Sequence, residues 1–231
     1  MLALGGHGPA RPEEGAHVPL RSARAAALWI AVALSARLAA QGPPGTRTEP
    51  AGSPHAREAL AICGRADAAP TAEKAALIAR GLALAEQAVA EDERDAPAHL
   101  AVFCNLGKQM RLSGVALSSL TALRRLRHEV DRALELAPEY TDALVGKGSL
   151  LLGTPRLLGG DPVEGERLLR VALRSDPDAL DARLELARGL AARGARDEAR
   201  SEAQHALAVA EREEDSARAA EARQLLGRLS K

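Results

Sequence analysis

Residues 130–194 read VDRALELAPEYTDALVGKGSLLLGTPRLLGGDPVEGERLLRVALRSDPDALDARLELARGLAARG, and their internal repetition indicates the fold. It contains the pattern Ala-Leu-x-x-x-Pro twice, first from Ala133 to Pro138 and again from Ala172 to Pro177. Proline has no backbone N–H to donate and disfavours helical geometry in the residue before it. The stretch therefore predicts two similar helices, each of which ends just before its proline.

Small residues recur at fixed distances from these prolines. Gly148 lies ten positions after Pro138, and Ala187 lies ten positions after Pro177. Where two helices cross closely only Gly or Ala fits, and large apolar residues at helical spacing fill the space on either side. The pattern advances by 39 residues from Ala133 to Ala172 and by 34 to Ala206. Such intervals are typical of an array of helical repeats.

The unit from Leu180 to Glu213 resembles one tetratricopeptide repeat of 34 residues, with Gly194 at the turn between its helices. The two units before it resemble the same repeat in degenerate form, because they carry extra residues between their helices and lack the Trp of the family. The positions that carry the resemblance are Gly107, Ala133, Pro138, Gly148, Ala172, Pro177, Ala187, Ala199 and Ala206. The resemblance implies a right-handed stack of antiparallel helix pairs.

Composition supports an all-α fold. Aromatic residues make up only 1% of the 231 residues, whereas hydrophobic residues make up 46%. The chain is rich in Ala, Leu, Arg and Glu, which favour helices, and poor in the β-branched and aromatic residues that favour strands. The pattern from Ala217 to Leu229 predicts a last helix that closes the array, because terminal repeats need such a cover.

The N-terminal region has a different composition from the rest. Arg21 and Arg24 precede the uncharged run Ala25–Ala36, and small residues follow it. A basic start, about a dozen apolar residues and then small residues are typical of a secretory signal peptide. We therefore predict a signal peptide over residues 1–40 and a periplasmic or secreted mature chain. The alternative is an uncleaved N-terminus that anchors the protein to a membrane.

Two further segments follow this leader. Residues 41–55 have linker composition, with prolines and glycines throughout, and are predicted to tether rather than pack. Residues 56–231 are predicted to form the helical repeat domain. Within it, Thr71 is a candidate N-cap for a helix that runs to about Asp92.

The extra residues Thr154–Asp161 form the most individual stretch of the domain. The expected capping residues are Gly159 and Gly160, which end a helix, and Asp161, Pro162 and Glu164, which begin the next one with a capping box. This loop ahead of an Ala-Leu-x-x-x-Pro helix also resembles the periplasmic T component of TRAP transporters. The region Ala98–Leu226 is similar to bacterial relatives of the regulator of microtubule dynamics family.

Charge argues against a nucleic-acid partner. Without residues 1–40 the chain carries 27 Lys and Arg against 29 Asp and Glu, and no aromatic residues alternate with the basic ones. Four basic residues stand close together at Arg124, Arg125, Arg127 and His128. The leucines between them recur at helical spacing, so these side chains are predicted to lie on the solvated side of the helix.

No catalytic motif occurs in the sequence. It lacks G-x-S-x-G, a P-loop, H-E-x-x-H and C-x-x-C, and its six histidines show no metal-ligand spacing. We therefore expect no enzymatic activity, no cofactor and no metal. The two cysteines, Cys63 and Cys104, fall in the first helices of successive pairs and can meet in a disulfide if the chain is exported. The alternative is that both are buried free thiols.

Two functions follow from these resemblances. The first is an exported scaffold or adaptor that binds a peptide or partner protein in a concave groove, because a stack of helix pairs presents an extended concave surface. The second is a periplasmic accessory of a TRAP-type transport system that binds a small molecule. A genomic neighbour encoding a TRAP permease would favour the second.

Overall fold

The computed structural model describes residues 49–112 and 120–230, which belong to one compact unit. These residues form helices joined by short turns, and no strand occurs among them, so the predicted all-α fold is confirmed. None of their helices is long and apolar enough to cross a membrane. The predicted signal peptide lies outside the described residues. The elements are α2 (Pro54–Ala66), α3 (Thr71–Glu91), α4 (Ala96–Leu112), α5 (Leu120–Leu136), α6 (Thr141–Gly153), η1 (Arg156–Leu158), α7 (Pro162–Ser175), α8 (Leu180–Ala192), α9 (Arg196–Arg212) and α10 (Ser216–Leu229).

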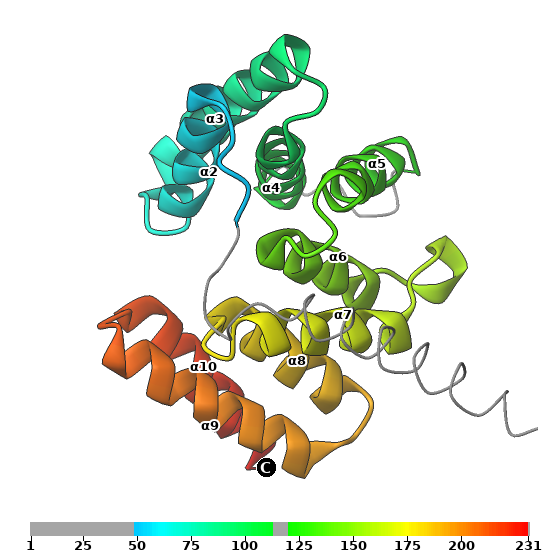
Figure 1. Cartoon of the computed structure of the whole chain (residues 1–231). Helices are drawn as coiled ribbons and strands as arrows, with labels where there is room; N and C mark the ends of the chain where they lie inside the picture. The colour runs from blue at the N-terminus through cyan, green and yellow to red at the C-terminus, as the bar shows by residue number, and fades with distance from the viewer. Residues whose placement is uncertain (1–48, 113–119, 231) are drawn as a thin grey trace, which may run out of the picture. The chain divides into compact units, whose positions relative to one another are not determined.

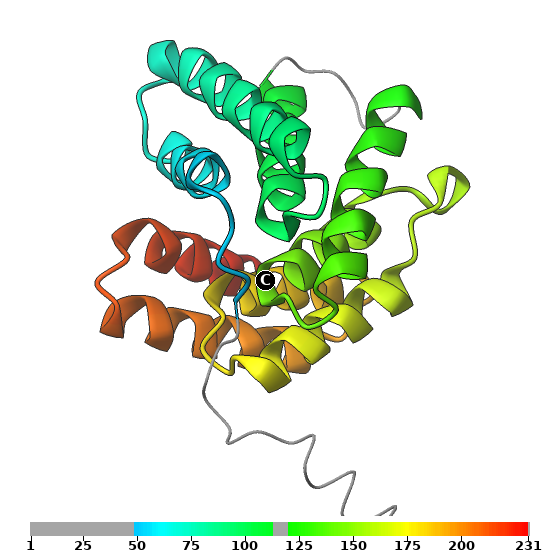
Figure 2. The same ribbon diagram turned by 45° about the horizontal axis from the view of Figure 1, so that its top comes forward.

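The helices form four successive pairs, α2/α3, α4/α5, α6/α7 and α8/α9, and α10 packs on the last pair (Figure 1). The first helix of each pair contacts the first helix of the next, from α2 through α4, α6 and α8 to α10. The second helices of successive pairs lie farther apart in the described part of the chain, and ion pairs such as that of Arg125 with Glu86 link α3 to α5. The first helices therefore line the inner side of a curved stack, and Figure 2 shows the same order from a second direction.

Small residues allow the paired helices to cross closely. A Cβ atom added to Gly148 of α6 would lie 2.9 Å from Cγ of Leu169 and 3.0 Å from the carbonyl oxygen of Gly165, both in α7. Real Cβ atoms seldom tolerate such distances, so glycine is required at this crossing. The repeat-pattern alanines are fully buried between helices at Ala133, Ala172, Ala187, Ala199 and Ala206.

Gly107 behaves differently from the other small repeat residues. A Cβ atom at this position would make only ordinary contacts, the nearest at 3.8 Å from Leu126. The expected close approach of two helices therefore does not occur at Gly107. The α4/α5 pair leaves room there for a larger residue.

Helix ends follow the sequence signals in most places. Pro138 and Pro177 each lie two residues beyond the end of a helix, α5 and α7 respectively. Gly194 adopts φ +86° in the turn between α8 and α9, a conformation that glycine reaches without steric cost. Thr71 is not an N-cap as expected, because Pro70 holds that position and no side chain caps α3.

The predicted linker ends earlier than residue 55. Ser53 caps α2 by accepting a hydrogen bond from the backbone N–H of Ala56, so the helix already begins at Pro54. The backbone N–H of Ser53 donates to the Asp95 carboxylate at 2.7 Å, just before α4. The last residues of the segment therefore pack against the repeat domain rather than tether it.

Candidate functional site

The seam between α8 and α10 carries a network of charged side chains on the inner side of the stack. Arg188 pairs with Glu185 at 2.5 Å within α8 and also reaches Glu221 of α10. Arg218 of α10 pairs with Asp181 at 2.8 Å and with Glu221 at 3.0 Å. Burial raises the pKa of Glu185 above its usual value, although Arg188 opposes the shift.

The two ends of the stack influence each other's charges across this inner side. Burial raises the pKa of Asp181, which Arg218 opposes and the carboxylates of Glu221 and Asp67 increase. Asp67 lies at the end of α2, and Lys108 of α4 also acts on Asp181. The side chain of Asp181 keeps 56% of its accessible surface, so the neighbouring side chains shield its carboxylate from water only in part.

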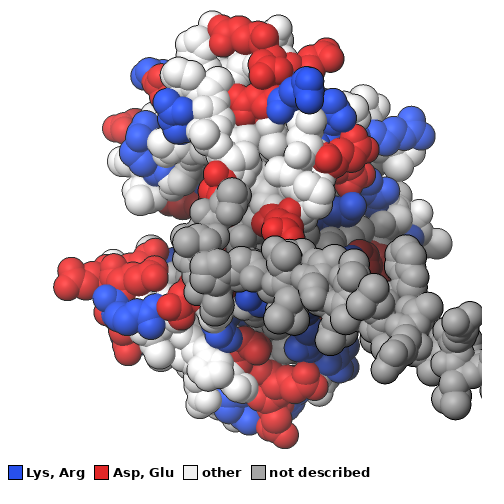
Figure 3. Space-filling view, in the orientation of Figure 1, with Lys and Arg blue, Asp and Glu red and all other residues white. Residues whose placement is uncertain are grey.

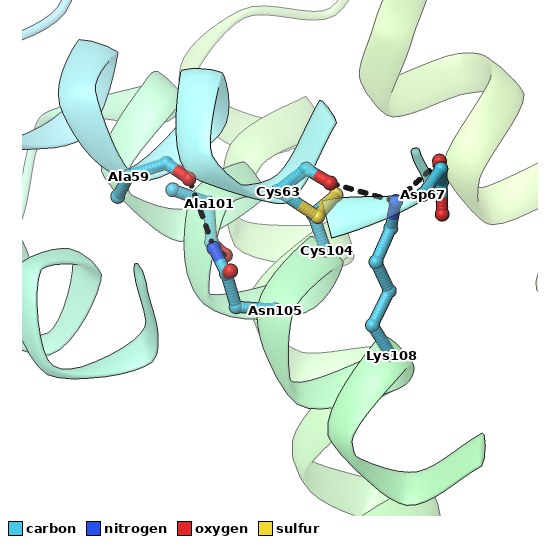
Figure 4. Close-up of a disulfide and its surroundings, with 7 residues drawn as sticks. All are labelled: Ala59, Cys63, Asp67, Ala101, Cys104, Asn105 and Lys108. Carbon is cyan, nitrogen blue, oxygen red and sulfur yellow. Dashed lines mark hydrogen bonds and ion pairs between the residues drawn. A yellow bond between two sulfur atoms is a disulfide. The ribbon is translucent and has the colours of Figure 1, made fainter. Parts of the chain in front are cut away.

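Lys108 connects α4 to the end of α2 (Figure 4). Its ammonium group donates to the backbone oxygen of Cys63 at 2.7 Å and pairs with Asp67 at 2.5 Å. One turn earlier on α4, the amide of Asn105 donates to the backbone oxygen of Ala59 at 3.1 Å. These contacts pair Lys108 and the amide nitrogen of Asn105 with α2, whereas Oδ1 of Asn105 is buried without a hydrogen-bond partner among the described residues.

The structure brings the two cysteines together at the same helix contact. A disulfide joins Cys63 of α2 to Cys104 of α4, and their Cα atoms lie 6.3 Å apart. Cys63 is fully buried. Figure 4 shows the bond between the Asn105 and Lys108 contacts, so all three features fix α2 on the same face of α4.

Two open hollows lie where successive repeats meet. The C-terminal hollow has a volume of about 360 Å³, and the N-terminal hollow has a volume of about 240 Å³. The C-terminal hollow is lined by Arg188, Ala191, Ala192, Arg196, Leu225, Arg228 and Leu229. The N-terminal hollow is lined by Ala66, Asp67, Lys74, Ile78, Lys108, Arg111 and Leu112. Both combine basic side chains with an aliphatic floor.

Comparison with known proteins identifies the fold. TTC0263, a thermophilic TPR protein from Thermus thermophilus whose crystal structure is known, matches 72% of this chain and 81% of its own, with a TM-score of 0.53 and 22% identity. The chain has the fold of a tetratricopeptide-repeat array. YrrB, described as a TPR protein with an unusual peptide-binding site, matches 74% of this chain and 98% of its own, with a TM-score of 0.38 and 19% identity. No family model and no curated protein sequence matches the chain.

The likeness to TTC0263 supports the tetratricopeptide fold and no narrower family. The resemblances to the T component of TRAP transporters and to the regulator of microtubule dynamics family rest on the sequence alone. Within the array, the repeat-pattern residues of the sequence other than Gly107 lie at helix crossings and turns, not on the inner charged seam.

The loop between α6 and α7 contains most of the capping features expected of it. Gly159 adopts φ +83°, and the Asp161 carboxylate accepts from the backbone N–H groups of Val163 and Glu164 at the start of α7. The expected role of Glu164 in the capping box is wrong. Both oxygens of the Glu164 carboxylate accept from Arg167 instead, and this interaction lowers the pKa of Glu164.

One of the four clustered basic residues departs from the expected solvated face. Arg127 is half-buried and donates to the backbone oxygen of Leu158 at 2.6 Å, which ties α5 to the loop after α6. A Cβ atom on Gly159 would lie 2.6 Å from this guanidinium, so the loop lies directly against it. Arg124, Arg125 and His128 are exposed, as the pattern predicts.

Sequence reasoning missed a buried ion pair between α4 and α5. Nδ1 of His99 lies 2.8 Å from the Glu129 carboxylate, and Nε2 of His99 lies 3.1 Å from the backbone oxygen of Glu93. Burial opposes a charge on His99, but these two hydrogen bonds outweigh it and raise the pKa of His99 above its usual value. No motif signals this pair, because its members are 30 residues apart.

Proposed function

We propose that this protein is an exported scaffold whose inner face binds a peptide or a partner protein. The observation that carries the proposal is the row of first helices, which presents a charged seam between α8 and α10 and ends in open hollows at both ends of the stack. Curved helical stacks use such surfaces to bind extended partners. The paired charges along the seam provide donors and acceptors that are already held in place.

Export is supported by two independent features. The leader of residues 1–40 has the composition of a signal peptide, and Cys63 and Cys104 are joined in the structure. Disulfides form and persist mainly in oxidising compartments outside the cytoplasm. We expect the mature chain to begin near Gln41. N-terminal sequencing of protein from fractionated cells tests this, and an intact leader in the cytosolic fraction would contradict it.

Site-directed photo-crosslinking in the native host tests the binding face. A photoreactive residue replaces Glu185 on the inner side of α8 or, as controls, Arg124 of α5 and Arg174 of α7, which are exposed on second helices. We expect one defined protein partner to be captured from position 185 and not from the two control positions. Capture from the control positions alone, or of no protein from any position, would overturn the proposal.

Native mass spectrometry of protein purified from its host separates the two functions predicted from the sequence. A peptide or protein partner retained on the chain supports the scaffold. A bound metabolite would instead favour the accessory of a TRAP-type transport system. The two outcomes differ by mass, so one measurement distinguishes them.

A further inference from the structure

The two hollows are built from equivalent parts of the array, at its opposite ends. Each is formed by the end of one first helix, by the second helix of the same pair and by the next first helix. In the C-terminal hollow these are α8, α9 and α10, and in the N-terminal hollow they are α2, α3 and α4. Each receives an Arg-Leu dipeptide from the later helix, Arg228-Leu229 or Arg111-Leu112. The same surface therefore occurs twice.

The C-terminal hollow has two basic side chains without an internal counter-charge. Arg188 is already neutralised by Glu185 and Glu221. Arg196 and Arg228 form no ion pair or hydrogen bond through their side chains with any described residue, and both are exposed.

The N-terminal hollow repeats this arrangement. Lys108 is neutralised by Asp67 and is almost covered, with 12% of its side chain exposed. Lys74 and Arg111 have no side-chain ion pair or hydrogen bond to the described part of the chain. Each hollow thus combines one satisfied cation, two unsatisfied cations and an aliphatic floor, which contains Leu225 and Leu229 in one case and Ile78 and Leu112 in the other.

We propose that each hollow binds an acidic side chain of a partner polypeptide together with an adjacent aliphatic side chain. Guanidinium and ammonium groups form their strongest hydrogen bonds with carboxylates, and a neighbouring aliphatic group gains by leaving water on the Leu and Ala side chains. This recognition rests on the proposed function and specifies its partner as an acidic, aliphatic segment.

The small size of the hollows and the mixed charge of the surface favour a peptide over a longer polyanion. Acidic and basic side chains are interspersed over the described part of the face in Figure 3, and no broad basic field covers it. Nucleic acids are bound through many basic groups along the phosphate backbone. Two small separate hollows with aliphatic floors match individual side chains instead.

Fluorescence anisotropy with four synthetic peptides tests the ligand chemistry. The first peptide mixes Glu and Leu, and the others replace Glu by Gln, Glu by Lys, or Leu by Ser. We expect binding of the Glu and Leu peptide alone, weakened by added salt because ion pairs at an exposed site are screened. Equal binding of the Glu and Ser peptide would show that charge alone is recognised and would overturn the proposal.

Paired charge-removing variants of the full chain locate the binding. They are Arg196→Gln with Arg228→Gln, and Lys74→Gln with Arg111→Gln, and the matched control is Arg124→Gln with Arg174→Gln. We expect each double variant of a hollow to lower the affinity for the Glu and Leu peptide about tenfold, because two charge-assisted hydrogen bonds are lost. The control should leave this affinity unchanged. Thermal melts matching the parent exclude misfolding.

Three outcomes contradict the inference in different ways. Unchanged affinity in both hollow pairs would place the peptide elsewhere on the chain. Tighter binding of anionic vesicles or of an oligonucleotide, with the same loss in the hollow pairs, would assign the hollows to phosphates. If the partner captured through position 185 binds the double variants of both hollows as tightly as it binds the parent, the inference fails while the proposed function stands.

Discussion

The two ends of the array hold their terminal helices with different interactions. At both ends one first helix contacts the next, α2 on α4 and α8 on α10. The N-terminal contact combines the disulfide of Cys63 and Cys104 with buried or nearly covered hydrogen bonds from Asn105 and Lys108. The C-terminal contact uses partly exposed ion pairs, such as Arg188 with Glu221, above buried leucines.

The difference follows from the side chains available to each terminal helix. The buried surface of α2 consists of Ala56, Ala59, Ala66 and the larger Ile62, besides Cys63, so it removes little apolar area from water. In α10, Leu225 and Leu229 are buried and add to the hydrophobic contact. A covalent bond therefore stabilises the end whose terminal helix buries fewer large aliphatic side chains, whereas the other end relies on leucines.

Removing the disulfide is expected to have the largest effect and to weaken the N-terminal end selectively. Replacing Cys63 and Cys104 together by Ala should lower the free energy of unfolding by about 4 kcal/mol in the chain-entropy model, because the bond closes a long loop. Urea unfolding measures the loss, and hydrogen exchange should show it first in α2 and α3. Uniform loss of protection across α8 to α10 as well would contradict the comparison.

Overpacking the centre of the stack should affect both ends. Gly148→Leu forces α6 and α7 apart, Ala172→Leu overfills the core around α7, and each should cost ~1–3 kcal/mol. The matched control is Gly227→Leu, because a Cβ atom at Gly227 would meet no other atom within 4 Å. Thermal melts compare the three variants with the parent. If both test variants melt like the parent, the assignment of these positions to close helix contacts is wrong.

The buried pair of His99 and Glu129 should make the N-terminal half sensitive to pH. Because the pKa of His99 is raised in the folded protein, its contribution to stability is complete below about pH 6.5 and is lost as pH rises through the raised value. Arg125 and Arg132 face the same pair. Chemical denaturation across this pH range should show a falling free energy of unfolding in the parent.

Glu129→Gln is the control for this pH dependence. It removes the carboxylate that favours the charged imidazole, while burial still opposes that charge. The variant should therefore be less stable than the parent at low pH and should lose the downward slope. A slope equal to that of the parent would assign the dependence to other groups.

Most of the fold could be predicted from the sequence because the signals for it are local. Residues at a helix crossing must be small, so Gly148 and Ala172 could be placed from spacing alone, and prolines marked the helix ends. The cysteines could be predicted to meet because corresponding helices of successive repeats stack side by side. Thr71 was misplaced by one position, since Pro70 occupies the cap.

The candidate site was less predictable because it depends on helices far apart in the chain. Arg127 follows the same spacing as its solvated neighbours, and only the path of the loop after α6 brings Leu158 to it. The hollows form where three helices meet, so Arg196 and Lys74 carry no signal within one repeat. The Arg-Leu dipeptides at Arg111 and Arg228 are no guide, because the same dipeptide also occurs outside the hollows, as at Arg167 and Arg183.

The smallest expected effect concerns the ion pairs of the C-terminal end. Arg188 and Glu221 keep 33% and 30% of their side chains exposed, so solvent screens their attraction and limits it to at most about 1 kcal/mol. A double-mutant cycle with Arg188→Gln and Glu221→Gln measures the coupling at low and high salt. We expect a weak coupling that salt reduces further, while the disulfide effect at the other end stays unchanged because covalent loop closure is not electrostatic. A coupling of several kcal/mol that resists salt would mean that the two ends are held with similar strength.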